Sequence, residues 1–222
     1  MGYLPGELGL YSDLTGYELL AFLERIEGRT VSREYRNNLA ERFKLSDRDL
    51  SRRLREYSTG MKRKLGLIQA FQADPPLLIL DEPTEGLDPL MQEAFYELLA
   101  DARNRGRTVF MSSHVLPEVA RICDRIAMLR KGDVVLLSSV EDVRKLASRR
   151  VSVSFRQDVA VPASLPLGYE MIDANPRTWI LRVTGQLGSL PSFLAALPVA
   201  DFAVEEARLE DVLVKYYRDG AE

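Results

Sequence analysis

Four consecutive aliphatic residues, Leu77–Leu80, end directly at an acidic pair, Asp81 and Glu82. A run without a polar position favours a strand buried on both faces, as in a parallel sheet covered by helices. Ligands of open α/β sheets bind at the carboxyl ends of the strands, where this pair falls. Because side chains alternate along a strand, one carboxylate could hold a metal ion while the other addresses a water molecule. The simpler alternative is that two acids merely end a strand and Pro83 starts a turn.

Apolar residues at three- and four-residue spacing predict helices before this strand. Thr15 and Glu18 form a capping box, which predicts a helix over about residues 16–27. A second helix is expected over about residues 32–43. The charged run 46–57 is interpreted as a solvated helix face.

A further helix is predicted to begin after Ser58, whose side chain is typical of an N-cap. Its first turn carries Lys62, Arg63 and Lys64, although the helix dipole disfavours cations there. Cations beside the free N–H groups of a helix start form a natural anion site. In the alternative interpretation, the basic side chains extend into water or pair with Glu56.

Two more elements follow the acidic pair. Asp88 and Pro89 are typical of the N-cap and first position of a helix, which continues to about Asn104. The apolar run 108–111 predicts the next strand, and His114, the only histidine, follows its carboxyl end. A lone histidine more often has a structural role than a catalytic one. His114 becomes a candidate only because it is expected near the two acids.

The rest of the chain predicts smaller elements around a change in composition near residues 148–150. Before this change we expect a helix near 116–123 that buries Cys123, a hairpin around Lys131–Asp133 and a helix over 140–147. Beyond it come short β-type runs and two helices, at 151–155, 179–183, 202–204, 188–196 and 209–217. This last part contains no catalytic grouping and is predicted to be a small accessory domain.

Composition narrows the class of protein. Hydrophobic residues make up 46% and charged residues 28% of the 222 positions, as in ordinary soluble globular proteins. The net charge of −3 gives no general attraction to nucleic acid or to anionic membranes. The single cysteine excludes an internal disulfide framework and fits a reducing cytosol. No run approaches the length of about eighteen apolar residues that spans a membrane, and the N-terminus does not have the pattern of a signal peptide.

Several short segments occur in an informative order along the chain: Ser58-Thr59-Gly60, then Leu77–Glu82 with Gly86-Leu87-Asp88, then His114. With this order and spacing, the chain resembles the nucleotide-binding subunit of an ABC transporter. Ser58-Thr59-Gly60 is similar to the signature motif usually written LSGGQ, and Leu77–Glu82 to the Walker B strand. Gly86-Leu87-Asp88 is similar to the D-loop, and His114 to the switch histidine.

The resemblance implies an α/β fold. Residues 1–147 would be an incomplete P-loop NTPase-type domain of the ABC ATPase kind, with a mostly parallel sheet and a helical subdomain at about residues 10–72. Within it, residues 10–57 would contact the membrane permease. Residues 148–222 are similar to the small α+β extension of exporter-type ATPases.

The resemblance also implies ATP and Mg²⁺ as cofactors and in-line attack of water on the γ-phosphate. Asp81 would hold Mg²⁺, Glu82 would orient or deprotonate the attacking water, and His114 would contact the γ-phosphate. The residues expected at the ATP of a partner subunit, or at the dimer contact, are Ser58, Thr59, Gly60 and Asp88. For Asp88, capping a helix is already a sufficient explanation.

The function implied is that of the ATP-hydrolysing subunit of an exporter for a drug, lipid or other small molecule. Its partners would be a second ATPase subunit, in a homo- or heterodimer, and an integral membrane permease. The expected location is cytoplasmic, at the inner face of the membrane, without nucleic acid. The competing class, soluble ABC ATPases acting on ribosomes or DNA, usually has two nucleotide domains or long coiled-coil insertions, and neither occurs here.

The chain departs from the family pattern in two respects. No GxxxxGK[ST] sequence occurs, so the backbone cradle and lysine for the phosphates are missing. Gly6 stands where the resemblance places the Q-loop glutamine, and Glu7 is an open substitute. Truncation at the N-terminus would explain the first departure. The alternative is a degenerate, non-hydrolysing protein that acts as a regulatory or interaction partner. The isolated chain is expected to bind ATP weakly and not to turn it over.

Overall fold

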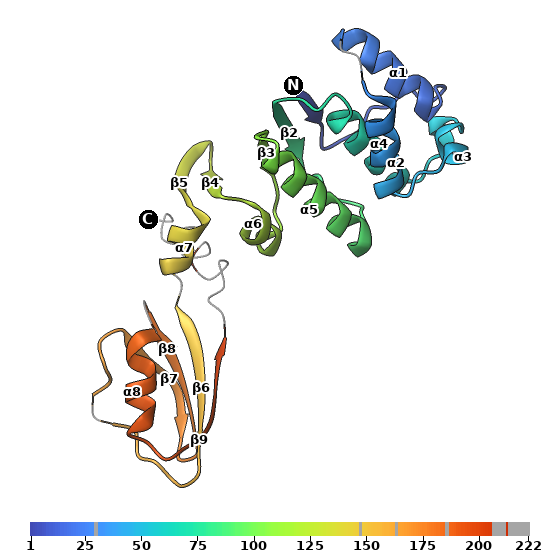
Figure 1. Ribbon diagram of the computed structural model, residues 1–222. Helices are drawn as coiled ribbons and strands as arrows, with labels where there is room; N and C mark the ends of the chain where they lie inside the picture. Colours follow the sequence, from blue (N-terminus) through green and yellow to red (C-terminus); the bar gives the residue numbers. More distant parts are fainter. Residues whose placement is uncertain (29–30, 147, 163, 185–186, 206–211, 213–222) are drawn as a thin grey trace. The chain divides into compact units, whose positions relative to one another are not determined.

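The computed structural model describes residues 1–28, 31–146, 148–162, 164–184, 187–205 and 212 (Figure 1). Contacts divide the chain into two compact units, Met1–Val115 and Leu116–Glu222, and each is described by itself. The predicted domain boundary between residues 147 and 148 falls inside the second unit and remains a prediction. Within the described ranges, no helix combines the length and the apolar composition needed to cross a bilayer.

The first unit contains a parallel sheet in the order β1 (Gly2–Leu4), β2 (Leu77–Asp81) and β3 (Thr108–Ser112). The parallel sheet and its covering helices confirm the predicted α/β class. Two helices contact the outer strands, α4 (Thr59–Phe71) on β1 and α5 (Pro89–Asn104) on β3. All three strands therefore present their carboxyl ends at one edge.

The two faces of this sheet differ in burial. Leu78 and Leu80 on β2 are each 1% exposed, as expected for the core. The opposite face carries the row Tyr3, Ile79 and Phe110, paired across the three strands. Tyr3 is 50% and Phe110 65% exposed, while Ile79 is half-buried. The expected burial on both faces is therefore wrong for the described residues, because an unbroken aliphatic run does not specify what covers each side.

Helices form most of the remainder of the first unit. The predicted helices are α1 (Gly16–Glu27), with the Thr15–Glu18 capping box, and α2 (Arg33–Arg42), capped by Ser32. The run 46–57 is not one solvated helix face. It contains the short helix α3 (Asp47–Leu50) and the 3-10 turn η1 (Leu54–Glu56). The leucines that end α3 and begin η1 are buried, which gives this charged stretch an inward face.

Tyr57 joins this region to the following helix. Its hydroxyl donates a hydrogen bond to the carbonyl of Asp49 at 2.7 Å, and burial raises the pKa of Tyr57 to about 12. A Cβ added to Gly16 would approach the same hydroxyl to 2.6 Å. Tyr57 thus packs between the start of α1 and the end of α3, directly before the segment that begins α4.

The second unit begins with α6 (Leu116–Ile122), the hairpin β4 (Arg125–Arg130) and β5 (Asp133–Ser139), and α7 (Val140–Leu146). Positive φ angles at Lys131 and Gly132 form the predicted hairpin turn. A small core of Ile126, Val140, Val143 and Val212 includes the half-buried Cys123 at its margin, where burial raises the pKa of the thiol.

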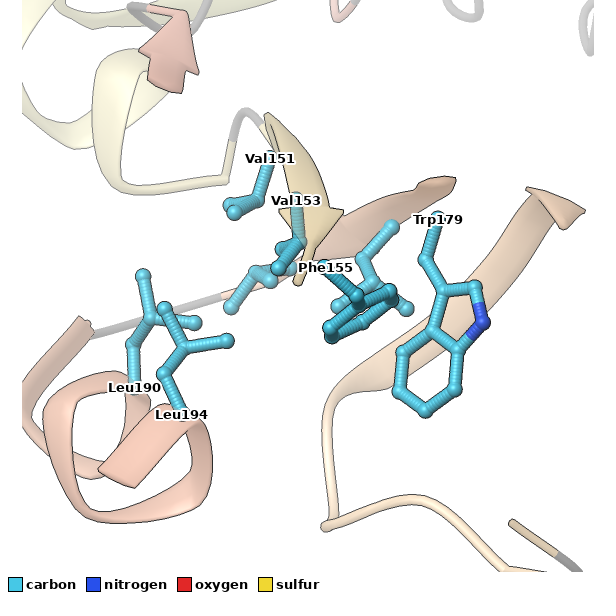
Figure 2. Close-up of a cluster of buried hydrophobic side chains, with 8 residues drawn as sticks. Val151, Val153, Phe155, Trp179, Leu190 and Leu194 are labelled. Carbon is cyan, nitrogen blue, oxygen red and sulfur yellow. The ribbon is translucent and has the colours of Figure 1, made fainter. Parts of the chain in front are cut away.

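The accessory sheet is antiparallel, in the order β7-β8-β6-β9. Its strands are β6 (Arg149–Phe155), β7 (Tyr169–Asn175), β8 (Thr178–Val183) and β9 (Val199–Glu205), and the helices near it are η2 (Leu187–Ser189) and α8 (Leu190–Ala195). Leu190 and Leu194 of α8 point towards the valines of β6, and Trp179 packs beside Phe155 (Figure 2). The predicted helix 209–217 lies outside the described residues, apart from Val212.

Candidate functional site

The carboxyl edge of the parallel sheet brings together the acidic pair and the end of the next strand. The register places Asp81 on β2 directly beside Ser112 on β3. The Ser112 hydroxyl donates a hydrogen bond to Asp81 Oδ1 and accepts one from the Glu82 backbone N–H at 3.0 Å. One hydroxyl group therefore contacts both members of the acidic pair.

Glu82 has a left-handed backbone conformation, with φ at 46°. For a residue with a side chain, this conformation costs about 1–3 kcal/mol, and such strained residues cluster at active sites and ligand-binding loops. Its carboxylate Oε2 lies 2.9 Å from Nδ1 of His114. The Glu82 side chain is 26% exposed and that of His114 76%, so this pair is open to solvent and to a ligand. A carboxylate oriented by an imidazole has the arrangement expected of a general base.

Asp81 offers one oxygen towards the loop that follows β1. A Cβ added to Gly6 would lie 2.8 Å from Asp81 Oδ2, so the carboxylate packs against the bare backbone at this position. A side chain at the glycine that departs from the family pattern would therefore require the Asp81 carboxylate to move.

The oxygen atoms at this edge could bind Mg²⁺ only together with further oxygen ligands, such as those of substrate phosphates. Asp81 supplies a carboxylate, a ligand type that Mg²⁺ accepts, and the Ser112 hydroxyl is hydrogen-bonded to this carboxylate. Among the described residues, no three His, Cys, Asp or Glu side chains gather into a metal-binding group. Mg²⁺ characteristically binds through one or two carboxylates together with substrate phosphates, and this sparse set matches that pattern.

The segment that begins α4 contacts a different loop. The Ser58 hydroxyl accepts a hydrogen bond from the Met61 N–H at 3.2 Å, which confirms its predicted role as N-cap. A Cβ added to Gly60 would lie 3.2 Å from the Gly86 carbonyl oxygen. Asp88 caps α5 through a 3.0 Å hydrogen bond from the Met91 N–H. The start of α4 thus lies beside the loop around Gly86.

Arg63 does not take part in the basic anion site predicted at the start of α4, and the rest of that site stays a prediction. Its side chain is buried and donates to the carbonyls of Glu85 and Pro5, each at 3.1 Å, and to the Glu85 carboxylate at 3.3 Å. Because the guanidinium donates its hydrogen bonds to groups of the protein itself, Arg63 is not available to bind an anionic ligand. The alternative pairing with Glu56 is also wrong for Arg63, since Glu56 pairs with Arg52.

The sequence did not predict the roles of two residues of this region, Ser112 and Arg63. Ser112 could have been found from strand register, because it occupies the position on β3 that matches Asp81 on β2. The role of Arg63 had no comparable signal, since its acceptors are backbone carbonyls of distant segments.

A parallel sheet with helices on it and an acidic pair at its carboxyl edge has the architecture of a P-loop NTPase-type α/β domain. Comparison with known proteins agrees. A family model described as "AAA domain, putative AbiEii toxin, Type IV TA system" matches residues 16–119. An uncharacterized ABC transporter ATP-binding protein of Alkalihalophilus pseudofirmus is 36% identical over 222 residues, 97% of this chain and 82% of that protein. The chain belongs to the family of ABC transporter ATP-binding proteins.

Two further relatives and a solved structure are also similar to this chain. An uncharacterized ABC transporter ATP-binding protein of Nostoc sp. is 39% identical over 64% of this chain and 44% of its own length. A fluoroquinolones export ATP-binding protein of Mycobacterium tuberculosis is 31% identical over 92% of this chain and 64% of its own. A solved ATP-binding subunit of an ABC transporter superposes with a TM-score of 0.59 at 33% identity, covering 65% of this chain and 60% of that one. The chain thus spans less than half the length of the Nostoc relative.

Proposed function

We propose that this chain is the ATP-binding and ATP-hydrolysing subunit of an ABC-type membrane exporter. The observation that carries the proposal is the group at the carboxyl edge of the parallel sheet, where Ser112 contacts both acids and His114 lies 2.9 Å from Glu82. The export relative from Mycobacterium tuberculosis supports the direction of transport.

In this proposal, Asp81 holds Mg²⁺ and Glu82 takes the proton of the attacking water. His114 keeps the Glu82 carboxylate in place and contacts the γ-phosphate. Mg²⁺, when bound with ATP, neutralises the charge that develops on the phosphoryl oxygens. The exposure of Glu82 and His114 leaves both side chains accessible to a nucleotide.

A second subunit completes the site. The residues that bind the nucleotide held mainly by that subunit are Ser58, Thr59, Gly60 and Asp88. Ser58 and Thr59 are exposed, and the backbones of Gly60 and Gly86 approach each other closely. ATP-dependent dimerisation then drives an integral membrane permease, which holds the chain at the cytoplasmic face of the membrane. Nucleic acid has no part in the cycle.

The absence of GxxxxGK[ST] from the 222 residues bears on what these residues do alone. The backbone cradle for the β- and γ-phosphates is the main source of phosphate affinity in P-loop NTPases. The isolated chain is therefore expected to bind ATP weakly and not to hydrolyse it. The alternative is a non-hydrolysing ABC protein that regulates a partner.

The test is to tag the gene at its chromosomal locus and to purify the complete protein with its partners from native membranes in mild detergent. We expect an integral membrane protein to co-purify and the assembly to hydrolyse ATP in a Mg²⁺-dependent manner. Glu82→Gln should lower turnover by about 10²–10⁴-fold, as expected for loss of a general base. Glu97→Gln, on an exposed position of α5, is the matched control and should leave turnover unchanged.

The possible outcomes separate the two candidates. Near-normal turnover of the Glu82→Gln assembly would remove Glu82 from the catalytic role. An assembly that contains the permease and binds ATP, but never hydrolyses it, would instead establish the regulatory protein.

A further inference from the structure

Ser112 stands out at the carboxyl edge because a single hydroxyl serves two neighbouring acids by opposite hydrogen bonds. Its O–H donates to Asp81 Oδ1, and its oxygen accepts from the Glu82 backbone N–H at 3.0 Å. A hydroxyl has one proton to donate and lone pairs to accept, so both bonds form at once. The side chain of one residue and the backbone of the next are thereby tied to the adjacent strand.

The bond to Asp81 selects which carboxylate oxygen is available. Oδ1 accepts the hydrogen bond from Ser112, and Oδ2 lies on the side of Gly6, which carries no side chain to cover it. A carboxylate whose plane is held in this way presents the same oxygen to a metal ion each time, instead of rotating between two. Parallel register enforces the arrangement, because Asp81 and Ser112 are paired positions of β2 and β3.

The bond to the Glu82 N–H supports a strained backbone. Glu82 has φ at 46°, in the left-handed region that residues with side chains rarely occupy. Such a conformation persists only where its surroundings hold it, and Ser112 supplies one of those contacts. In this conformation the carboxylate of Glu82 reaches Nδ1 of His114 at 2.9 Å.

We infer that Ser112 is a positioning residue that sets both the metal-binding oxygen of Asp81 and the orientation of the Glu82 base. This inference rests on the proposed function, since it assigns Ser112 to the same reaction. Ser112 touches neither water nor phosphate in this scheme and acts through the two acids.

The neighbouring Ser113 provides a matched control. Its hydroxyl accepts a hydrogen bond from the Val115 N–H at 3.0 Å, within its own loop. Ser113→Ala therefore removes the same atoms from the next residue, without touching either acid.

The experiment measures ATP hydrolysis against Mg²⁺ concentration in the tagged assembly. Glu82→Gln should lower the maximal rate with little change in the Mg²⁺ requirement, and Asp81→Asn should raise that requirement. Ser112→Ala should do both, with about tenfold effects on each quantity, because it loosens both acids. Ser112→Thr keeps the hydroxyl and should restore both quantities, while Ser113→Ala should match the wild type.

The rates and Mg²⁺ requirements of these variants test the role of Ser112 separately from the proposed function. A normal rate in Glu82→Gln would overturn the proposed function and the role of Ser112 with it. If Glu82→Gln is inactive but Ser112→Ala behaves as Ser113→Ala does, the proposed function stands and the inference is wrong. An effect of Ser112→Ala on the maximal rate alone, with an unchanged Mg²⁺ requirement, would also contradict it.

The isolated chain offers a readout that does not depend on turnover. His114 is the only histidine, so its imidazole gives one set of NMR signals. Glu82→Gln should shift these signals by removing the carboxylate, and Ser112→Ala should shift them in the same direction. If Ser113→Ala shifts the His114 signals more than Ser112→Ala does, closeness to His114 explains the shifts, and the positioning role of Ser112 is wrong.

Discussion

At the scale of single residues, two acids adopt left-handed backbone conformations at opposite ends of β2. Asp74 precedes the strand with φ at 41°, and Glu82 follows it with φ at 46°. Each is held by polar contacts, Asp74 by Arg107 and Arg105, and Glu82 by Ser112. The contacts of Asp74 are structural because they lie at the amino end of the strand, whereas those of Glu82 lie at the edge where ligands bind.

The pairing of Asp74 predicts a dependence of stability on pH. The hydrogen bond from Arg107, with help from Arg105, lowers the pKa of Asp74 below its ordinary value of 3.8. The ionised carboxylate therefore stabilises the folded state above that pH, and this contribution is lost as the pH falls through the lowered pKa. Asp74→Asn keeps a residue that tolerates the left-handed backbone and removes the charge.

Urea unfolding at several pH values tests this effect. Asp74→Asn should be less stable than the wild type at pH 7, and the difference should shrink below about pH 4. Arg107→Gln should give a similar loss at pH 7, and the double variant should lose little more, because both changes break one interaction. A pH-independent difference, or fully additive losses, would contradict the assignment.

At the scale of elements, α4 is attached to the sheet loops through Arg63. Helix formers and the Ser58 cap explain why α4 forms, but they do not fix where its first turn lies. Arg63 is 4% exposed and bonds to the carbonyls of Pro5 and Glu85, one after β1 and one after β2. This side chain thus holds the Ser58–Gly60 segment beside both loops that border the candidate site.

Arg63→Met is expected to lower the free energy of unfolding by about 1–3 kcal/mol, because two carbonyls lose their donor in a buried place. Lys62→Met, in the same helical turn, should change it by no more than about 0.5 kcal/mol, since methionine and lysine have similar helix propensities. Glu85→Gln should also have a small effect, because the Glu85 side chain is 65% exposed. Equal losses in Arg63→Met and Lys62→Met, measured by urea unfolding, would argue against the anchoring role.

At the scale of the whole molecule, the chain contains two units with separate cores. Leu20, Phe71 and Phe95 are buried in the first unit. The accessory sheet of the second unit encloses Trp179 and Phe155, whose rings meet edge to face with centroids 4.6 Å apart. Because each unit buries its own apolar side chains, a change in one core need not alter the other.

Trp179 is the only tryptophan, so its fluorescence reports on the accessory sheet alone. Arg63→Met should lower the unfolding midpoint of the first unit, measured by hydrogen exchange of β2 and α4. The midpoint measured by Trp179 fluorescence should stay the same. A Trp179 midpoint that moved as far as the exchange midpoint would show that the two units unfold as one.

The sequence by itself determined the local elements and the family. Thr15, Ser58 and Asp88 cap helices as predicted, because a cap involves residues only three apart along the chain. The strand β7 was missed, because its charged positions at an edge of the sheet do not form an apolar pattern. The order of the short motifs indicated an ABC ATPase, and the relatives confirm that family.

The tertiary structure alone decided how these parts meet. Ser112 lies 31 positions from Asp81, and the Pro5 carbonyl lies 58 positions from Arg63, so neither contact leaves a trace in local periodicity. The exposure of Phe110 was hidden for the same reason, since a strand pattern shows which residues are apolar but not what covers them. Strand register and long-range packing set these features, and they arise only when distant segments are brought together.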